Sequence, residues 1–180
     1  FYHSLALKDD GTVFAWGAGS LNHGVSYQEF GQSIVPTGLN GVTAIAAGFA
    51  RSLALKRDGT VVVWGRDDEG LTNGPRQEQS EVMAIAAAGH HSVALKKDGG
   101  VVVWGDGKRS VARAARSGVV AIGTGSTHAL ALKNDGTVVV WGDNKYGQTT
   151  MPEHLNGVVA IAAGGRHSVA LIGKPLPSVP

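Results

Sequence analysis

The chain has 180 residues, 43% of them hydrophobic, and a formal net charge of +2 at pH 7. A chain of this length and hydrophobic content can bury a core, so the composition argues against intrinsic disorder. The nearly balanced charge gives no overall basic field of the kind that binds nucleic acid. Cysteine is absent, which excludes disulfides and thiolate metal sites, and no apolar run reaches the roughly 18 residues of a membrane-spanning helix.

One string recurs along the chain. It reads "HSLALKDDGTVFAWG" over residues 3–17, returns in close copies at 51–65, 91–105 and 128–142, and a fifth start, "HSVAL", opens at His167. The tryptophans at 16, 64, 104 and 141 are separated by 48, 40 and 37 residues. Periods near 40 residues indicate a solenoid or a propeller.

The predicted elements repeat in the same order. The first unit, residues 1–41, begins within a repeat, and further repeats start near 42, 82, 119 and 158, followed by a tail at 174–180. In each full repeat, a short run of small and branched residues ("VVAIGTG") precedes an alternating strand ("HALALK"), an Asp-Gly turn and a β-branched strand ("TVVVWG"). The Asp-Gly pairs are expected to supply the positive φ of a two-residue hairpin.

Units of about 40 residues with three or four antiparallel strands predict an all-β propeller. The alanines of the "AIAAG" strands are expected to crowd near the central axis. The tryptophans should fill the wider gaps between blades. About four and a half blades are present, which favours part of a larger ring, with closure by a second chain as the alternative.

The recurring string resembles the regulator of chromosome condensation repeat in its short bacterial form. It is also similar to the propeller-type β-lactamase inhibitor proteins, which are built of the same unit. The resemblance implies a seven-bladed ring that binds other proteins. Seven blades would need roughly 270 residues, so the printed chain would be only a part of such a ring.

Blade geometry predicts where a partner would bind. The loops that follow "AAG" and "WG" should share one rim, which we call the AAG–WG rim, and the Asp-Gly turns should face the other side. The two residues before each "HS"-type start differ in every repeat, whereas the frame around them is constant. Because binding residues concentrate on loops of a rigid scaffold, these variable positions are the best candidates.

Three loops after "WG" carry further candidates. The first, residues 18–32, contains Tyr27 and Phe30; exposed aromatic side chains suit a protein-binding hot spot, and the alternative is a loop that folds over the edge of its own blade. The second, residues 66–81, is acidic, but its spacing fits no standard calcium loop. The third, residues 106–118, is basic and could meet an acidic protein face or phosphate, or be simply solvated; its cations are Lys108, Arg109, Arg113 and Arg116.

The inhibitor-like relatives imply a second set of candidates, because they grip a partner with aromatic and acidic side chains on this rim. Carried over by position, the slots before the "HS" start hold Tyr2, Phe49, His90 and Arg166. The slots within "WGDNKY" hold Asp143, Asn144 and Tyr146. The expected partner is therefore another protein, with a β-lactamase-like enzyme as one candidate, and self-association through open blade edges as a further one.

The histidines at 3, 91, 128 and 167 occupy one equivalent slot per repeat, with Arg51 in the second, so they are expected to be structural hydrogen-bonding groups and not a catalytic set. We therefore expect no enzyme activity, cofactor or metal. The lack of a long apolar run likewise leads us to expect no membrane partner. The alternative function is a lectin-like propeller with one sugar site per blade, although the variable rim positions count against it. The sequence does not determine the cellular location, although a secreted or cell-surface bacterial location is favoured.

Overall fold

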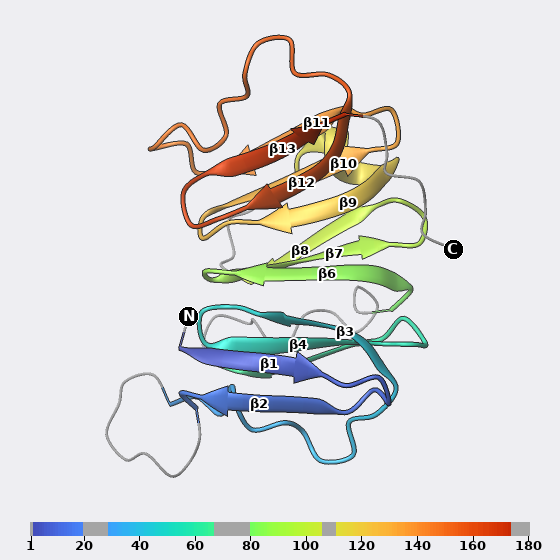
Figure 1. Ribbon diagram of the computed structural model, residues 1–180, viewed down its shortest axis with the longest axis vertical. Helices are drawn as coiled ribbons and strands as arrows, with labels where there is room; N and C mark the ends of the chain where they lie inside the picture. The colour runs from blue at the N-terminus through green and yellow to red at the C-terminus, as the bar shows by residue number, and fades with distance from the viewer. Residues whose placement is uncertain (1, 20–28, 67–79, 106–110, 174–180) are drawn as a thin grey trace.

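The computed structural model describes residues 2–19, 29–66, 80–105 and 111–173. In these residues thirteen strands form five antiparallel sheets, which follow one another in chain order from one end of the molecule to the other (Figure 1). The first sheet has β1 (His3–Leu7) and β2 (Val13–Gly17); the second has β3 (Val42–Ala47), β4 (Arg51–Lys56) and β5 (Val61–Gly65); the third has β6 (Val82–Ala88), β7 (His91–Lys96) and β8 (Val101–Gly105); the fourth has β9 (Val119–Thr124), β10 (His128–Lys133) and β11 (Val138–Gly142); and the fifth has β12 (Val158–Ala163) and β13 (Ser168–Ile172). The predicted all-β class and the three-stranded blades are confirmed.

The alternating strand lies at the centre of every complete sheet. β4 pairs with β3 on one edge and with β5 on the other, and β7 and β10 repeat this arrangement. The first strands β3, β6, β9 and β12 contact one another in succession, which agrees with the prediction that their small residues face a common axis. One 3₁₀ turn, η1 (Arg113–Arg116), precedes β9. In the described part of the chain no helix is long and apolar enough to cross a membrane.

The turn at the Asp-Gly pairs differs from the prediction. In the first sheet the Lys8 N–H donates to the Thr12 carbonyl and the Gly11 N–H donates to the Lys8 carbonyl, both over 2.9 Å. Gly11 has a φ of 83°, whereas Asp10 is not among the described residues with positive φ. The turn is therefore a three-residue loop in which glycine alone takes the left-handed conformation, and not a two-residue hairpin. The same pair of hydrogen bonds recurs in the next three sheets.

The hydrophobic core lies between successive sheets. Trp104 of the third sheet packs with Leu53, Leu55 and Val61 of the second, and Trp64 of the second packs with Val13 of the first. The prediction that tryptophan fills the gap between blades is confirmed for these two residues, which are both buried. Trp64 and Trp104 therefore each pack on the sheet that precedes their own.

The two end sheets show what this arrangement leaves uncovered. Trp16 belongs to the first sheet, has no described sheet before it, and is 55% exposed. At the other end, Val169 and Leu171 of β13 stand where Leu53 and Leu55 stand in β4, and both are more than half exposed. Among the described residues, no further sheet therefore packs on Trp16 at one end of the series or on Val169 and Leu171 at the other.

Candidate partner-binding rim

The registers place the predicted rim at one end of every sheet. In the second sheet Ala47 pairs with Ser52 and Arg51 pairs with Gly65, so the end of β3, the start of β4 and the end of β5 lie together. Val42 pairs with Lys56 at the opposite end, beside the Asp-Gly turn. The loops after "AAG" and "WG" thus share one rim, as predicted.

Three predicted residues meet in a row on this rim. The ring centroids of Tyr2 and Phe49 are 6.1 Å apart in an edge-to-face arrangement, and those of Phe49 and His90 are 5.2 Å apart. These residues come from three successive sheets, and Tyr2 is 53% exposed while the other two are half-buried. Aromatic contacts at these distances fix the rings relative to one another. The row is therefore a preformed apolar surface that spans three blades.

The backbone below the row is tied between blades. The Phe49 N–H donates to the Gly89 carbonyl over 3.2 Å, and at the matching position two blades later the Ser126 N–H donates to the Gly165 carbonyl over 3.1 Å. A main-chain hydrogen bond makes no demand on the side chain that the residue carries. These two bonds therefore allow phenylalanine in the second blade and serine in the fourth. Gly89, at the matching position of the third blade, has a φ of 48° and leaves no room for a Cβ beside the Ser126 carbonyl.

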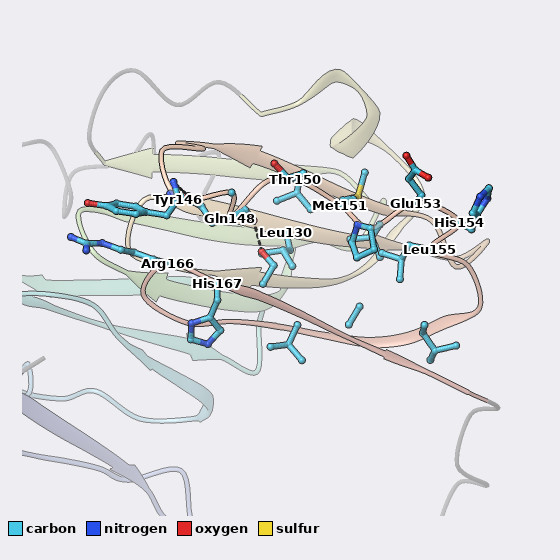
Figure 2. A pocket seen from close by; sticks show the side chains of 18 residues that line it. Leu130, Tyr146, Gln148, Thr150, Met151, Glu153, His154, Leu155, Arg166 and His167 are labelled. Atoms are coloured by element: carbon cyan, nitrogen blue, oxygen red, sulfur yellow. Dashed lines mark hydrogen bonds between the residues drawn. The ribbon is translucent and has the colours of Figure 1, made fainter.

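A second group of predicted residues lies on the loop after β11. The Arg166 guanidinium lies 4.4 Å from the centroid of the Tyr146 ring (Figure 2). The Lys145 ammonium lies 5.6 Å from the same centroid, so the ring is in cation–π contact with both cations. Tyr146 is 53% exposed, and Arg166 is exposed as well. This group presents an aromatic face and positive charge together.

Gln148 holds this loop in place. Its Oε1 accepts the Tyr146 N–H over 2.8 Å, and its Nε2 donates to Asp143 Oδ2 over 3.0 Å. Asn144 accepts the Thr149 N–H over 2.9 Å through its side-chain oxygen. Asp143 and Asn144, which the resemblance assigned to partner binding, thus already organise the loop itself.

Sequence reasoning missed the motif that positions these aromatics. The first loop ends in "FGQ", residues 30–32, where the Gln32 Oε1 accepts the Phe30 N–H over 2.9 Å. The "YGQ" of residues 146–148 repeats this contact, so aromatic-Gly-Gln is a loop-locking motif. Phe30 in turn contacts the Arg66 guanidinium, 5.0 Å from its centroid. The recurrence of "GQ" after "WG" in two repeats was the available signal.

The recurring histidine slot is part of the frame. His3 Nε2 lies 2.9 Å from Ser52 Oγ in the next sheet. Arg51 fills the slot in the second sheet, where its guanidinium donates to Ser92 Oγ and to the carbonyls of Gly89, Ala88 and His91 in the third sheet. For these two positions the predicted structural role is confirmed: each side chain forms hydrogen bonds that hold its sheet against the next one. Burial lowers the pKa of His3 below its usual value.

The structure does not bring the remaining candidates into one site. Tyr27, Lys108 and Arg109 lie outside the described residues. Arg113 and Arg116 are exposed on η1, and the Arg116 carbonyl approaches Gly100, in the Asp98–Gly99 turn region. Arg116 therefore lies toward the end of the blade opposite Phe49 and His90, although its loop begins on the AAG–WG rim.

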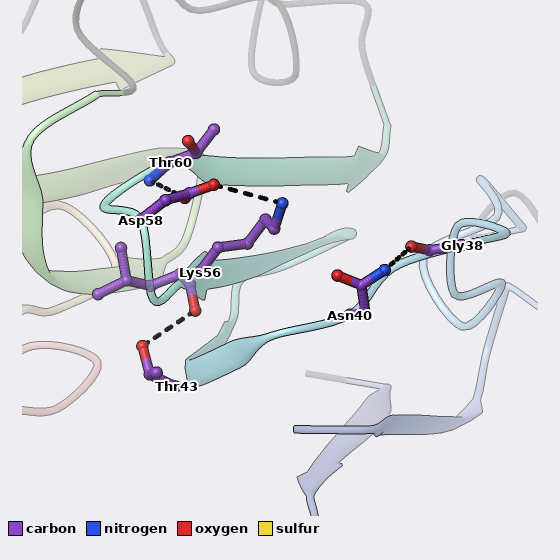
Figure 3. Close-up of polar contacts among 7 residues, drawn as sticks. Gly38, Asn40, Thr43, Lys56, Asp58 and Thr60 are labelled. Atoms are coloured by element: carbon purple, nitrogen blue, oxygen red, sulfur yellow. Dashed lines mark hydrogen bonds and ion pairs between the residues drawn. The ribbon is translucent and has the colours of Figure 1, made fainter. Parts of the chain in front are cut away.

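Depressed pKa values occur at the opposite end of the sheets as well. The Thr60 N–H donates to Asp58 Oδ1 over 2.9 Å, and this bond lowers the pKa of the Asp58 carboxyl, with the Lys56 ammonium 3.5 Å away (Figure 3). Asp10 and Asp135 repeat the arrangement with Thr12 and Thr137. These carboxylates are exposed turn-forming groups. Among the described residues no three His, Asp or Glu side chains gather as a metal site.

The three-stranded sheets, their order and the packing of Trp64 and Trp104 on the preceding sheet are those of β-propeller blades. Three segments, residues 1–24, 42–71 and 119–148, match the family model of the regulator of chromosome condensation (RCC1) repeat. The chain therefore contains repeats of this family, as the sequence resemblance predicted. Comparison with curated proteins gives no match, and the likeness to β-lactamase inhibitor propellers stays a prediction.

Solved structures agree with the fold. Prp20p from Saccharomyces cerevisiae is 21% identical with a TM-score of 0.69, and the match covers 94% of this chain and 53% of that one. Human WBSCR16 is 25% identical with a TM-score of 0.71, covering 96% and 56%. The ectodomain of the Arabidopsis thaliana receptor kinase ACR4 is 23% identical with a TM-score of 0.66, covering 96% and 57%. The chain spans about half the length of these structures.

Proposed function

We propose that this chain is a non-enzymatic protein-binding module and that its working surface is the AAG–WG rim. The observation that carries the proposal is the row of Tyr2, Phe49 and His90, in which three blades contribute rings to one surface. Partly exposed aromatic residues that are already fixed by their neighbours lose little conformational freedom on binding, which is the property of interface hot spots.

The similar structures support a binding role. Prp20p is described with its binding properties to Gsp1p and histones, and yeast RCC1 (Prp20) has been solved bound to Kap60. For the present chain the rim offers both apolar rings and the cationic groups Arg66, Lys145 and Arg166. A partner surface with acidic and apolar side chains would complement it.

The test is a triple variant, Tyr2→Ala with Phe49→Ala and Tyr146→Ala, compared with Phe14→Ala. Phe14 is as exposed as Tyr2 and Tyr146, at 53%, but lies on β2 within the first sheet and away from the rim loops. Both proteins are used as bait for partner capture, with urea unfolding to check that each is folded. We expect the triple variant to lose a partner that the wild type and Phe14→Ala retain.

Full capture by the folded triple variant would show that the rim is not the binding surface. Binding of glycans at several equivalent sites per chain would instead favour the lectin alternative. Inhibition of a β-lactamase is a narrower form of the same proposal. It is tested by adding the wild type and the triple variant to such an enzyme and measuring substrate hydrolysis.

A further inference from the structure

Two Asn-Gly pairs occupy the same place in the fold, immediately before the first strand of a sheet. Asn40 and Gly41 precede β3, and Asn156 and Gly157 precede β12. The two glycines have φ values of 65° and 63°, a left-handed conformation that glycine adopts without strain. Each asparagine is therefore followed by the one residue type that has no side chain to shield its main-chain nitrogen.

The two asparagine side chains make the same hydrogen bond. Asn40 Nδ2 donates to the Gly38 carbonyl over 3.0 Å (Figure 3), and Asn156 Nδ2 donates to the His154 carbonyl over 2.9 Å. Within the described residues neither side chain makes another hydrogen bond, and both asparagines are exposed. A single exposed bond of this kind holds each side chain only weakly.

The main-chain nitrogens that follow these side chains are not engaged. In the described part of the chain, neither the Gly41 N–H nor the Gly157 N–H donates to another residue. A Cβ added at Gly41 would meet nothing within 4 Å, and one added at Gly157 would meet only Ile172, at 3.8 Å. Each glycine therefore has room to move toward the side chain of the asparagine before it.

The Asp-Gly turns hold the corresponding groups in place. The Gly59 N–H donates to the Lys56 carbonyl over 2.9 Å, and the glycines of the other three turns repeat this bond. Asp58 Oδ1 accepts the Thr60 N–H over 2.9 Å, which lowers the pKa of the carboxyl and keeps it ionised. An ionised carboxylate resists attack by an amide nitrogen. The two kinds of Xaa-Gly pair therefore differ in both reacting groups.

We propose that Asn40 and Asn156 are sites of spontaneous deamidation in the folded chain. In the first step the glycine nitrogen bonds to the asparagine Cγ and gives up its proton, the bond from Cγ to Nδ2 breaks, and ammonia leaves behind a cyclic succinimide. In the second step water adds to either ring carbonyl and opens the ring to aspartate or isoaspartate. One water is consumed and one ammonia is released, with no oxidation or reduction.

The modification would act at the turn end of the sheets. Val42 pairs with Lys56 there, so Asn40 lies away from the AAG–WG rim, and the inference does not depend on the proposed function. The Gly41 carbonyl accepts the Arg57 N–H over 2.8 Å. Isoaspartate at position 40 adds one atom to the main chain beside this bond. We therefore expect the modified chain to unfold at a lower urea concentration than the unmodified one.

The experiment follows the reaction by peptide mapping. The folded chain is incubated at pH 8.5 and 37 °C, digested, and analysed by mass spectrometry, with fragmentation to assign each gain of mass to one residue. Synthetic peptides of residues 37–43 and 153–159 give the rates without the fold. We expect Asn40 and Asn156 to react within about tenfold of their peptides, because one exposed hydrogen bond retards release of the side chain no more than that. Asn73, also followed by glycine, lies outside the described residues and is mapped separately.

Asp58→Asn supplies the matched control. It puts an asparagine before Gly59, so the dipeptide is the same as at Asn40, but the glycine N–H donates to the Lys56 carbonyl. Reaction at this position requires the turn to open first. We therefore expect it to be at least about tenfold slower than at Asn40 in the same chain.

Wild-type Asn144 is a second control. Its Oδ1 accepts the Thr149 N–H over 2.9 Å, and the residue after it is lysine, so we expect it to stay unmodified while Asn40 reacts. Asn40→Gln and Asn156→Gln should each remove the reaction at the substituted position alone. The double variant with both changes should keep its urea midpoint through the incubation, whereas the midpoint of the wild type falls.

Three results would overturn the proposal. The first is a chain that unfolds cooperatively in urea and keeps Asn40 and Asn156 intact while the peptides convert; reaction at one asparagine alone would overturn the assignment of the other. The second is equal reaction at Asn40 and at the position changed in Asp58→Asn, because the engagement of the glycine nitrogen would then not control the rate. The third is modification without a fall in the urea midpoint, which would contradict the expected effect on the second sheet.

Discussion

The blade-to-blade clamp at Arg51 allows a quantitative test of whether the recurring slot is structural. Arg51 is 1% exposed and donates to Ser92 Oγ over 2.9 Å and to the Gly89 carbonyl over 3.1 Å. It also donates to the carbonyls of Ala88 and His91. Arg51→Ala would leave these buried acceptors without their donor while keeping the rim side chains unchanged.

Hydrogen bonds from a charged donor contribute about 1.5–3 kcal/mol each, and the desolvation of the guanidinium offsets part of their sum. We therefore expect Arg51→Ala to lower the free energy of unfolding by about 3 kcal/mol, a large fraction of the roughly 5–15 kcal/mol of an ordinary domain. Arg51→His should cost less, because His3 occupies the same slot and its Nε2 lies 2.9 Å from Ser52 Oγ. The histidine would keep one contact to Ser92 and lose those to the carbonyls.

Urea unfolding of the wild type, Arg51→Ala and Arg51→His at pH 7.5, followed by circular dichroism, measures how much each variant loses in free energy of unfolding. The order of stability should be wild type, then Arg51→His, then Arg51→Ala, with similar slopes against urea. A loss of less than about 1 kcal/mol in Arg51→Ala would mean that the clamp contributes little. Equal losses in both variants would contradict the assignment of one structural slot to histidine and arginine.

Two further predictions concern the loop and the turns. Gln148→Ala removes the acceptor of the Tyr146 N–H and the donor to Asp143, so we expect unfolding to become easier by about 1–2 kcal/mol in urea and proteolysis of residues 143–150 to become faster. The pKa of Asp58 is lowered first by the Thr60 N–H, so its charged form stabilises the fold above the ordinary pKa of aspartate, and this contribution is lost as pH falls through the folded pKa. Urea midpoints between pH 5 and 3 should therefore fall more steeply for the wild type than for Asp58→Asn, which keeps an acceptor at every pH; parallel curves would contradict this.

Repetition made the blade predictable, because each local signal was present four times. The alternation of "HSVALK", the β-branched "VVVW" and the glycine of each Asp-Gly turn fixed strand order and rim without any tertiary information. The turn type was less accessible, since Asp-Gly suits both two- and three-residue loops. The structure decides it through the bond from the Lys8 N–H to the Thr12 carbonyl.

The rim that carries the candidate site could be located from the sequence, whereas the contacts among its residues could not. The sequence located Tyr2, Phe49 and His90 as variable positions, but their contact depends on how closely three blades approach. The inward role of Arg51 was likewise hidden, because its partners lie 37 to 41 positions away in the chain. For the basic loop, sequence order was misleading. Arg116 follows a loop that begins on the rim, but in the fold it lies near Gly100, at the other end of the blade.

At the rim, main-chain hydrogen bonds connect neighbouring blades while some side chains take no part in them. A repeated fold can therefore carry rim side chains that differ from blade to blade. Between blades, the rim position of Phe49 is held by its N–H, and that of Ser126 by the same bond to Gly165. The side chains of Phe49 and Ser126 take no part in these two bonds. The proposed partner-binding surface would therefore be defined by side chains that these inter-blade bonds do not use.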